Sequence, residues 1–218
     1  MTLVYNFPMR PVIILFAKAP APGRVKTRLI PRLSPAAAAA LHTAFVWDLI
    51  ERLQSFNSVA DLELHTDAQT DVWSGSKVFQ ALQGEGDLGL KMLQAMGCAL
   101  SRGRPAAMIA GTDAPGVPLE YLEQLLHSPS DVALGPTEDG GFYAVSCRRI
   151  DARMFNEVEW STPHALRQTV SASEASGLTV ELGPPWWDVD TAADLDRLIA
   201  AGNLPKHTAD VLHERGIL

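Results

Sequence analysis

Four positively charged side chains follow a short apolar run near the start of the chain. They are Lys18, Arg24, Lys26 and Arg28, and Gly23 stands among them. Arginine offers a planar fork of donors and lysine a compact charge, so both bind phosphate oxygens through charge-assisted hydrogen bonds. The whole chain carries a formal net charge of -7, which this loop opposes locally. We expect the loop to hold the phosphates of a nucleotide; the alternative is a solvated surface loop whose charges only aid solubility.

Carboxylates that could hold a hard cation occur at two later points in the chain. Asp113 follows another apolar run, and Asp188 and Asp190 lie on either side of a valine. Magnesium prefers oxygen ligands and is usually held by one or two carboxylates together with substrate phosphates. We therefore predict Mg²⁺ or Mn²⁺ on Asp113 and Asp190, with Asp188 as a further candidate. The plainer alternatives are a turn aspartate at Asp113 and a helix cap at Asp190.

Two further segments could position a nucleotide and an acceptor. Gly84 and Asp87 lie in a glycine-rich stretch that would let the backbone approach a nucleotide closely. Glu138 or Asp139 could act as a positioning group or general base, although Asp-Gly-Gly also suits a hairpin turn. The aromatic residues that we expect around an acceptor pocket are Phe142, Trp160 and Trp186; the alternative is that the tryptophans are only core or rim residues.

Short apolar runs alternate with helical patterns along the chain. Strands are predicted at about 12–16, 60–65, 78–82, 106–110, 131–134, 142–147 and 179–182. Helices are predicted from Ser34-Pro35, from about 87 and 118, from 160–163 with Ser161 or Thr162 as cap, from about 191, and over 206–218. This alternation indicates an α/β protein with a mostly parallel sheet, in which the loops after the strands share one edge.

Length and composition narrow the class of protein. A chain of 218 residues suits one domain, with a core at about 11–200 and a helical tail at about 204–218. The acidic balance argues against a nucleic-acid partner, and no apolar run reaches the length of a membrane span. Cys98 and Cys147 form no metal-ligand pattern, so we expect reduced thiols in a cytoplasmic protein.

Six motifs occur in a fixed order between about Val12 and Leu198. They read Phe-Ala-Lys-Ala-Pro-x-Pro-Gly-x-Val-Lys-Thr-Arg-Leu, Gln-Gly-x-Gly-Asp-Leu-Gly, Gly-Thr-Asp-x-Pro, Leu-Gly-Pro-x-x-Asp-Gly-Gly-Phe-Tyr, Trp-Ser-Thr and Asp-Val-Asp-Thr-x-x-Asp-Leu. With them the chain resembles the bacterial DUF2064 family, described as glycosyltransferase-like, in the nucleotide-diphospho-sugar transferase superfamily of GT-A fold. More distantly it resembles the molybdenum-cofactor nucleotidyltransferases and the phospholactate guanylyltransferases.

The resemblance implies a Rossmann-like three-layer α/β/α fold, a nucleotide under the first loop, and Mg²⁺ or Mn²⁺ on Asp113 with help from Asp190. Two departures from the family pattern bear on function. Asp113 stands alone where many GT-A glycosyltransferases carry Asp-x-Asp, and Lys91 stands where arginine is expected. The first departure weakens the sugar-transfer interpretation, and the second keeps the charge without the fork geometry.

Three functions remain open at this point. The first is a metal-dependent glycosyltransferase-like enzyme that uses a nucleotide sugar, with Asp139 or Glu138 activating an acceptor hydroxyl. The second is a nucleotidyltransferase in which Lys26 and Arg28 hold the leaving pyrophosphate and a phosphorylated acceptor attacks. Four cations favour a triphosphate, whereas the family description favours sugar transfer. The third is a nucleotide-binding module without turnover. The base, the sugar, the acceptor and the oligomeric state are not specified by the sequence.

Overall fold

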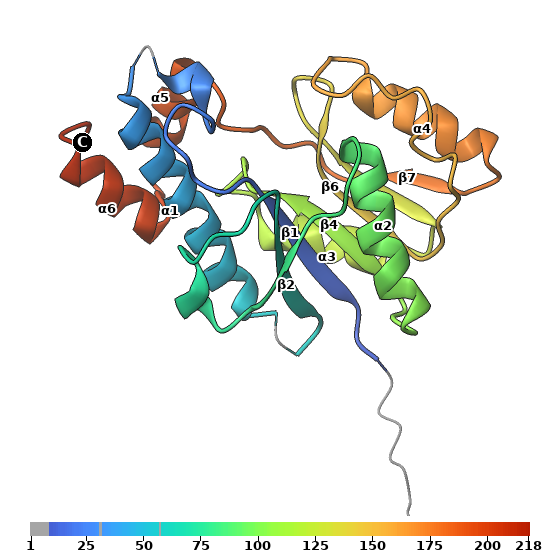
Figure 1. Cartoon of the computed structure of the whole chain (residues 1–218). Coiled ribbons are helices and arrows are strands. Elements are labelled where there is room, and N and C mark those ends of the chain that lie inside the picture. The colour runs from blue at the N-terminus through green and yellow to red at the C-terminus, as the bar shows by residue number, and fades with distance from the viewer. Residues whose placement is uncertain (1–8, 31, 57) are drawn as a thin grey trace, which may run out of the picture.

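The computed structural model describes residues 9–30, 32–56 and 58–218. Over this part of the chain the strands form one seven-stranded sheet of order β3-β2-β1-β4-β6-β5-β7. The strands are β1 (Val12–Ala17), β2 (Asp61–Thr66), β3 (Phe79–Leu82), β4 (Ala107–Gly111), β5 (Val132–Pro136), β6 (Phe142–Cys147) and β7 (Val180–Leu182). Only β6 runs antiparallel to its neighbours, β4 and β5. The prediction of a mostly parallel sheet is therefore confirmed (Figure 1).

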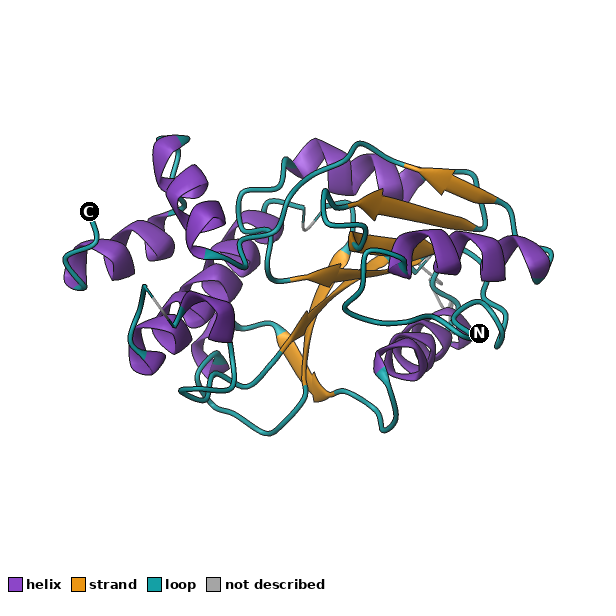
Figure 2. Cartoon of the chain, turned by 90° about the horizontal axis from the view of Figure 1, so that it is seen from above, coloured by secondary structure: helices purple, strands orange, loops and turns teal. Residues whose placement is uncertain are grey.

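Helices cover both faces of the sheet, as Figure 2 shows from above. They are α1 (Pro35–Gln54), α2 (Leu88–Ser101), α3 (Leu119–His127), α4 (Ala165–Ala175), α5 (Ala192–Ala200) and α6 (Lys206–Glu214). Ile13 and Leu15 of β1 pack in one core with residues of α1 and α3, whereas Val12 and Ile14 pack in a second core with α2 and α4. This alternation of side chains along a strand that is buried on both faces produces the predicted three-layer α/β/α fold.

Local sequence signals explain where several helices begin. The Ser34 hydroxyl accepts a hydrogen bond from the backbone N–H of Ala37, and Pro35 occupies the first turn of α1. Thr191 and Asp194 form a capping box at the start of α5. Both starts agree with the predictions, because a capping side chain satisfies N–H groups that the helix itself leaves unpaired.

The predicted start of the helix at 160–163 is wrong. α4 begins at Ala165, and the residue before it, His164, makes no side-chain cap. The Thr162 hydroxyl instead donates to the carbonyl of Glu159 and accepts from the N–H of His164. Ser161 adopts a positive φ of 62°. These residues form a turn of their own, because a Ser/Thr hydroxyl can bond nearby backbone without starting a helix.

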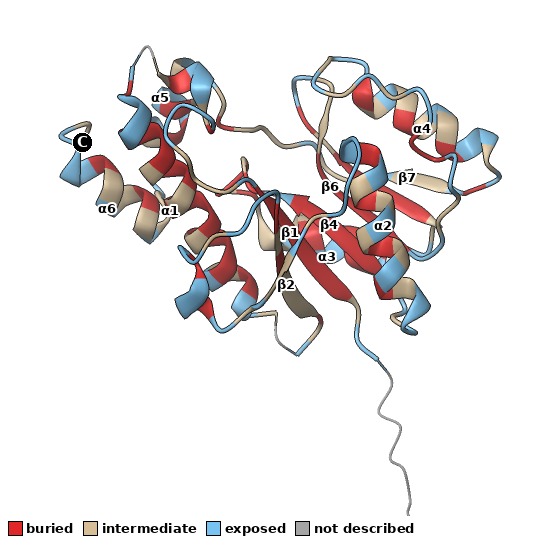
Figure 3. Cartoon of the chain, viewed as in Figure 1, coloured by how far each residue is buried: buried red, intermediate tan, exposed pale blue. Residues whose placement is uncertain are grey.

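A third hydrophobic cluster packs the loops at the carboxyl edge of the sheet against α1. It joins Leu29 of the basic loop, Phe45 of α1, Val189 and Leu195, together with Leu212 of α6. Figure 3 shows this buried zone along α1. The cluster brings the loop after β1 and the segment before α5 together, although the two are far apart in sequence. Within the described residues, no helix is long and apolar enough to cross a membrane.

Candidate functional site

The ammonium group of Lys26 lies at the centre of the site. Its Nζ is 2.6 Å from Asp113 Oδ1, 3.0 Å from Asp190 Oδ1 and 2.7 Å from the carbonyl oxygen of Val189. The Lys26 side chain is 3% exposed, whereas those of Asp113 and Asp190 are 45% and 35% exposed. The predicted basic loop and both predicted metal carboxylates therefore meet in one cluster, which we call the Lys26 cluster (Lys26, Asp113, Asp190).

The fold places these three residues at one edge of the sheet. β1 and β4 are parallel neighbours, so the basic loop and Asp113 leave the sheet side by side. The N–H of Val189 donates to the carbonyl of Asp113 at 2.8 Å, which ties the segment before α5 to the same edge. Lys26 itself has φ 47° and ψ 40°, a left-handed conformation that a non-glycine residue seldom adopts. Strained backbone of this kind often marks a functional site.

Burial and charge act in opposite directions on the Lys26 cluster. Burial alone would lower the pKa of Lys26, but the charges of Asp113 and Asp190 raise it above its usual value. Burial alone would raise the pKa of Asp113, and the neighbouring Lys26 lowers it instead. Lys26 and Asp113 thus each stabilise the charged form of the other, so both remain ionised at neutral pH.

The other three cations of the basic loop, Lys18, Arg24 and Arg28, lie at the solvent-exposed rim of the site. Lys18 and Arg24 are exposed and make no ion pair within the described part of the chain. Arg28 is 65% exposed and lies 3.9 Å from Asp190 Oδ2. Gly23 has a positive φ of 78°, and no atom lies near the position that a Cβ would take. These positions leave three cations available to an anion arriving from solvent.

His42 is a residue of the site that we did not predict. It lies on α1, and its Nε2 donates to the carbonyl of Lys18 at 2.9 Å. Burial is the main cause that lowers the pKa of His42, and Asp113 and Lys26 are close enough to affect it as well. A neutral His42 therefore supports the start of the basic loop from below. The sequence gives no signal for this role, since a single histidine in an alanine-rich helix looks like an ordinary core residue.

Asp188 and Asp139 extend the acidic side of the site. Burial, followed by the charges of Asp113, Asp190 and Asp139, raises the pKa of Asp188 to about 7, with Lys26 opposing this shift. Asp188 therefore lies close enough to Asp113 and Asp190 to interact with them electrostatically, and its part in holding a metal stays a prediction. Asp139 is close enough to take part in this electrostatic interaction.

The Asp-Gly-Gly segment forms the turn between β5 and β6. Oδ1 of Asp139 accepts from the Thr137 hydroxyl at 2.6 Å and from the N–H of Gly141 at 3.1 Å. Its second oxygen makes no hydrogen bond to any described residue. Glu138 forms a bidentate ion pair with Arg197, whose two terminal guanidinium nitrogens donate to Oε2 at 2.6 Å and to Oε1 at 3.0 Å. Of the two predicted acceptor-activating groups, only Asp139 keeps an oxygen available.

Gly84 and Asp87 follow β3 at the same edge of the sheet, but neither bonds to the Lys26 cluster within the described residues. Asp87 caps α2, because its carboxylate accepts from the N–H of Leu90 at 2.8 Å. A Cβ on Gly84 would meet the side chain of Gln94, so this glycine leaves space for that side chain. Their predicted contact with nucleotide stays a prediction, and the structure gives each of them a local role.

The predicted acceptor-pocket aromatics do not lie together. Phe142 and Trp160 pack edge to face, with ring centroids 6.2 Å apart, in the core beneath α2 and α4. Trp186 packs against Tyr121 in the core on the opposite face of the sheet. It also stacks on Trp187, at 6.1 Å between ring centroids. Phe142 and Trp160 thus share one core and Trp186 packs in the other, and their assignment to an acceptor pocket stays a prediction.

The carboxylates of Asp113 and Asp190 fit a divalent metal ion whose remaining ligands come from the substrate. Among the described residues, no group of three or more His, Cys, Asp or Glu side chains could hold a metal ion by itself. Asp113 and Asp190, however, both reach one cation, Lys26, and both are partly exposed. Mg²⁺ is usually bound by one or two carboxylates, with phosphate oxygens of the substrate completing its coordination shell. Asp113 and Asp190 are therefore the residues that would hold a metal.

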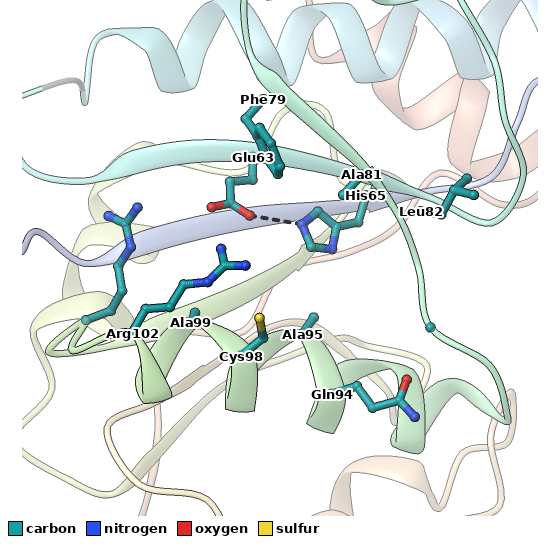
Figure 4. A pocket seen from close by; sticks show the side chains of 12 residues that line it. Glu63, His65, Phe79, Ala81, Leu82, Gln94, Ala95, Cys98, Ala99 and Arg102 are labelled. Carbon is teal, nitrogen blue, oxygen red and sulfur yellow. Dashed lines mark hydrogen bonds and ion pairs between the residues drawn. The ribbon is translucent and has the colours of Figure 1, made fainter.

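A separate pocket lies between α2 and the β2–β3 part of the sheet (Figure 4). Its volume is about 240 Å³, and the Glu63 and His65 side chains on its floor are paired at 2.9 Å. Cys98 and Arg102 of α2 and the adjoining turn line its other side. Of the predicted site residues only Gly84 borders this pocket, so it is distinct from the Lys26 cluster.

Comparisons with known proteins agree with this fold. A crystal structure from Desulfovibrio desulfuricans, provisionally named a nucleotide-diphospho-sugar transferase, is 30% identical, covers 96% of each chain and superimposes with a TM-score of 0.82. A cytidylyltransferase from Leptospira borgpetersenii is 14% identical, covers 94% of this chain and 93% of its own, and gives a TM-score of 0.55.

A third structure is the 4-diphosphocytidyl-2C-methyl-D-erythritol synthase of Anaerococcus prevotii. It is 9% identical, covers 91% of this chain and 100% of its own, and gives a TM-score of 0.57. At such identities the two cytidylyl-transferring structures indicate a common fold only. No curated protein matches the chain.

The sequence profile of a bacterial family, described as "Uncharacterized protein conserved in bacteria (DUF2064)", matches residues 54–162. This is the family that the six motifs indicate. Together with the 30% identical relative, which aligns over nearly the whole chain, the match shows that this protein belongs to the DUF2064 family.

Proposed function

We propose that this protein is a divalent-metal-dependent transferase that uses an activated nucleotide. The observation that carries the proposal is the Lys26 cluster, in which a phosphate-type basic loop and two partly exposed carboxylates meet at the carboxyl edge of a parallel sheet. Ligands of open α/β sheets bind at this edge. The names of the structural relatives, a nucleotide-diphospho-sugar transferase and cytidylyl-transferring enzymes, support a transferase that uses nucleotides.

Sugar transfer from a nucleotide sugar is the first candidate reaction. Lys26 is already paired with Asp113 and Asp190, so three cations of the basic loop remain for phosphates rather than four. This number suits a diphosphate and removes the surplus of charge that favours a triphosphate. The relative with 30% identity carries a name that points to the same chemistry.

Each residue then has a defined task in the transfer. Lys18, Arg24 and Arg28 bind the diphosphate of the donor through charge-assisted hydrogen bonds. A metal on Asp113 and Asp190 would supply Lewis-acid stabilisation of the leaving diphosphate. The free oxygen of Asp139 accepts the proton of the acceptor hydroxyl, while its other oxygen is held by the hairpin.

Nucleotidyl transfer is the second candidate, and a specific observation favours it. Glu138 is occupied by Arg197, and Asp139 has one oxygen bound within its own turn. An acceptor phosphate is already deprotonated at neutral pH, so its attack on the α-phosphorus needs no general base. In this reaction the rim cations would bind the leaving pyrophosphate.

The leaving group distinguishes these reactions. The experiment incubates the protein with radiolabelled nucleoside triphosphates or nucleotide sugars, with Mg²⁺ or Mn²⁺ and a pool of small acceptors, and identifies the phosphorus products. Nucleoside diphosphate as product supports sugar transfer, and pyrophosphate supports nucleotidyl transfer. Nucleotide binding without either product would instead support a binding module without turnover. Asp139→Asn separates the first two further, because it should lower kcat for sugar transfer and leave nucleotidyl transfer intact.

A further inference from the structure

Lys26 differs from the other cations of the loop in being surrounded by oxygen atoms of the protein itself. An ammonium group has three N–H donors. Three oxygen atoms, from Asp113, Asp190 and the carbonyl of Val189, lie within 3.0 Å of Nζ. With 3% of its side chain exposed, Lys26 can meet a nucleotide phosphate only by giving up at least one of these partners.

The surrounding structure directs Lys26 inward. Val25 and Leu29, on either side of it, are buried, so the loop is anchored both before and after the lysine. The backbone of Lys26 itself is in the left-handed region, with a φ of 47°. Its Nζ lies 5.5 Å from the centre of the Phe45 ring of α1, which closes the site from below. The ammonium position is thus fixed by backbone and packing on several elements.

This position coincides with the carboxylates that a metal would use. Asp113 and Asp190 each direct Oδ1 at Lys26, and both carboxylates keep partial exposure on the other side. A divalent ion that approaches without nucleotide therefore meets an ammonium group already bound to its two ligands. Like charges a few ångströms apart repel appreciably at the dielectric of a protein surface. Nucleotide phosphates bring the negative charge that offsets this repulsion.

We infer that Lys26 is a built-in counter-cation that holds Asp113 and Asp190 as a pair and keeps divalent metal out until nucleotide arrives. The inference rests on the proposed function for the identity of the site. It predicts that metal and nucleotide enter together rather than metal first. It also assigns to Lys26 a positioning role on the carboxylates before any contact with phosphate.

The test measures the affinity of nucleotide-free protein for Mn²⁺ by electron paramagnetic resonance. Lys26→Gln keeps a hydrogen-bond donor and removes the charge, whereas Lys26→Arg keeps the charge. We expect weak binding to wild type and Lys26→Arg, and at least about tenfold tighter binding to Lys26→Gln. Adding Asp113→Asn to Lys26→Gln should remove that gain. An affinity of Lys26→Gln equal to or weaker than that of wild type would overturn the inference.

Loss of Lys26 leaves two neighbouring carboxylates without their counter-charge, so Lys26→Gln could unfold. In that case circular dichroism with and without Mn²⁺ replaces the affinity measurement. Recovery of the folded signal with Mn²⁺ supports the inference, and no recovery refutes it. These comparisons use no nucleotide. A failure of the proposed function would appear separately, as wild-type protein that binds neither nucleotides nor nucleotide sugars.

Discussion

Gly140→Ala tests how the hairpin that carries Asp139 is positioned. Gly140 has a φ of 89°, and an added Cβ would lie 2.3 Å from the carbonyl oxygen of Pro163 and 2.7 Å from its Cα. A positive φ costs a non-glycine residue about 1–2 kcal/mol. Forcing a methyl group into filled space costs about 1–3 kcal/mol more. We expect the free energy of unfolding to fall by about 2–5 kcal/mol in urea denaturation.

Gly177→Ala is the matched control. Gly177 follows α4 with a φ of 78°, and nothing lies within 4 Å of the position that its Cβ would take. This variant should lose only the conformational part, about 1–2 kcal/mol. Gly140→Ala should also lower kcat for sugar transfer, because Asp139 moves with the hairpin, while nucleotide affinity is kept. Equal losses of stability in the two variants would refute the packing of this hairpin against the 160–164 turn.

Three further substitutions test a helix cap, an ion pair at the amino end of the sheet, and a cation of the basic loop. Asp48→Ala removes the buried carboxylate that accepts from the first N–H groups of α6; it should cost about 1–3 kcal/mol and speed hydrogen exchange in α6. Burial alone would raise the pKa of Asp61, but Arg104 lowers it. Asp61→Asn should therefore destabilise by about 1 kcal/mol at pH 7, and in urea titrations this difference should begin to fade as the pH falls below about 4 and vanish only below the lowered folded-state pKa of Asp61. Arg28→Ala should raise the KM for nucleotide at least about tenfold in steady-state assays, whereas Arg32→Ala, which removes a cation paired with a neighbouring helix, should not.

The elements of the fold were predictable because their signals are local. The buried run at β1 and the Ser34-Pro35 start of α1 depend on burial on both faces and on capping. The turn at 160–163 carries similar Ser, Thr and Pro signals but does not start a helix. There Thr162 bonds to its own neighbouring backbone, and the sequence does not tell a turn of this kind from a helix cap.

Which residues come together in the candidate site was predictable from the sequence. Which of these residues form ion pairs with one another was not. The positions of Lys26, Asp113 and Asp190 after strands place them at one edge of a parallel sheet. Which of the four loop cations turns inward depends on the positive φ of Lys26 and on the apolar residues on either side of it. Contacts between residues so far apart in sequence leave no periodic pattern. For the same reason His42 was missed, since its relevance comes from a carbonyl across the fold.

The aromatic residues illustrate a further limit. The sequence around Trp160 and around Trp186 does not indicate which face of the sheet each side chain joins. In the structure they belong to cores on opposite faces of the sheet. For Trp186, the face is set by the pairing register of its segment beside β5, where Trp186 forms a bridge with Thr137. A change of register by one residue would reverse it.

In the proposed function, Asp113 and the basic loop form a metal-assisted nucleotide site. Thermal-shift measurement of wild type and Asp113→Asn with nucleoside diphosphates and triphosphates, each with and without Mg²⁺, tests this claim most directly. We predict that at least one nucleotide raises the Tm of wild type, that the rise requires Mg²⁺, and that Asp113→Asn loses it while remaining folded. No rise with any nucleotide, or the same rise in Asp113→Asn, would contradict the claim.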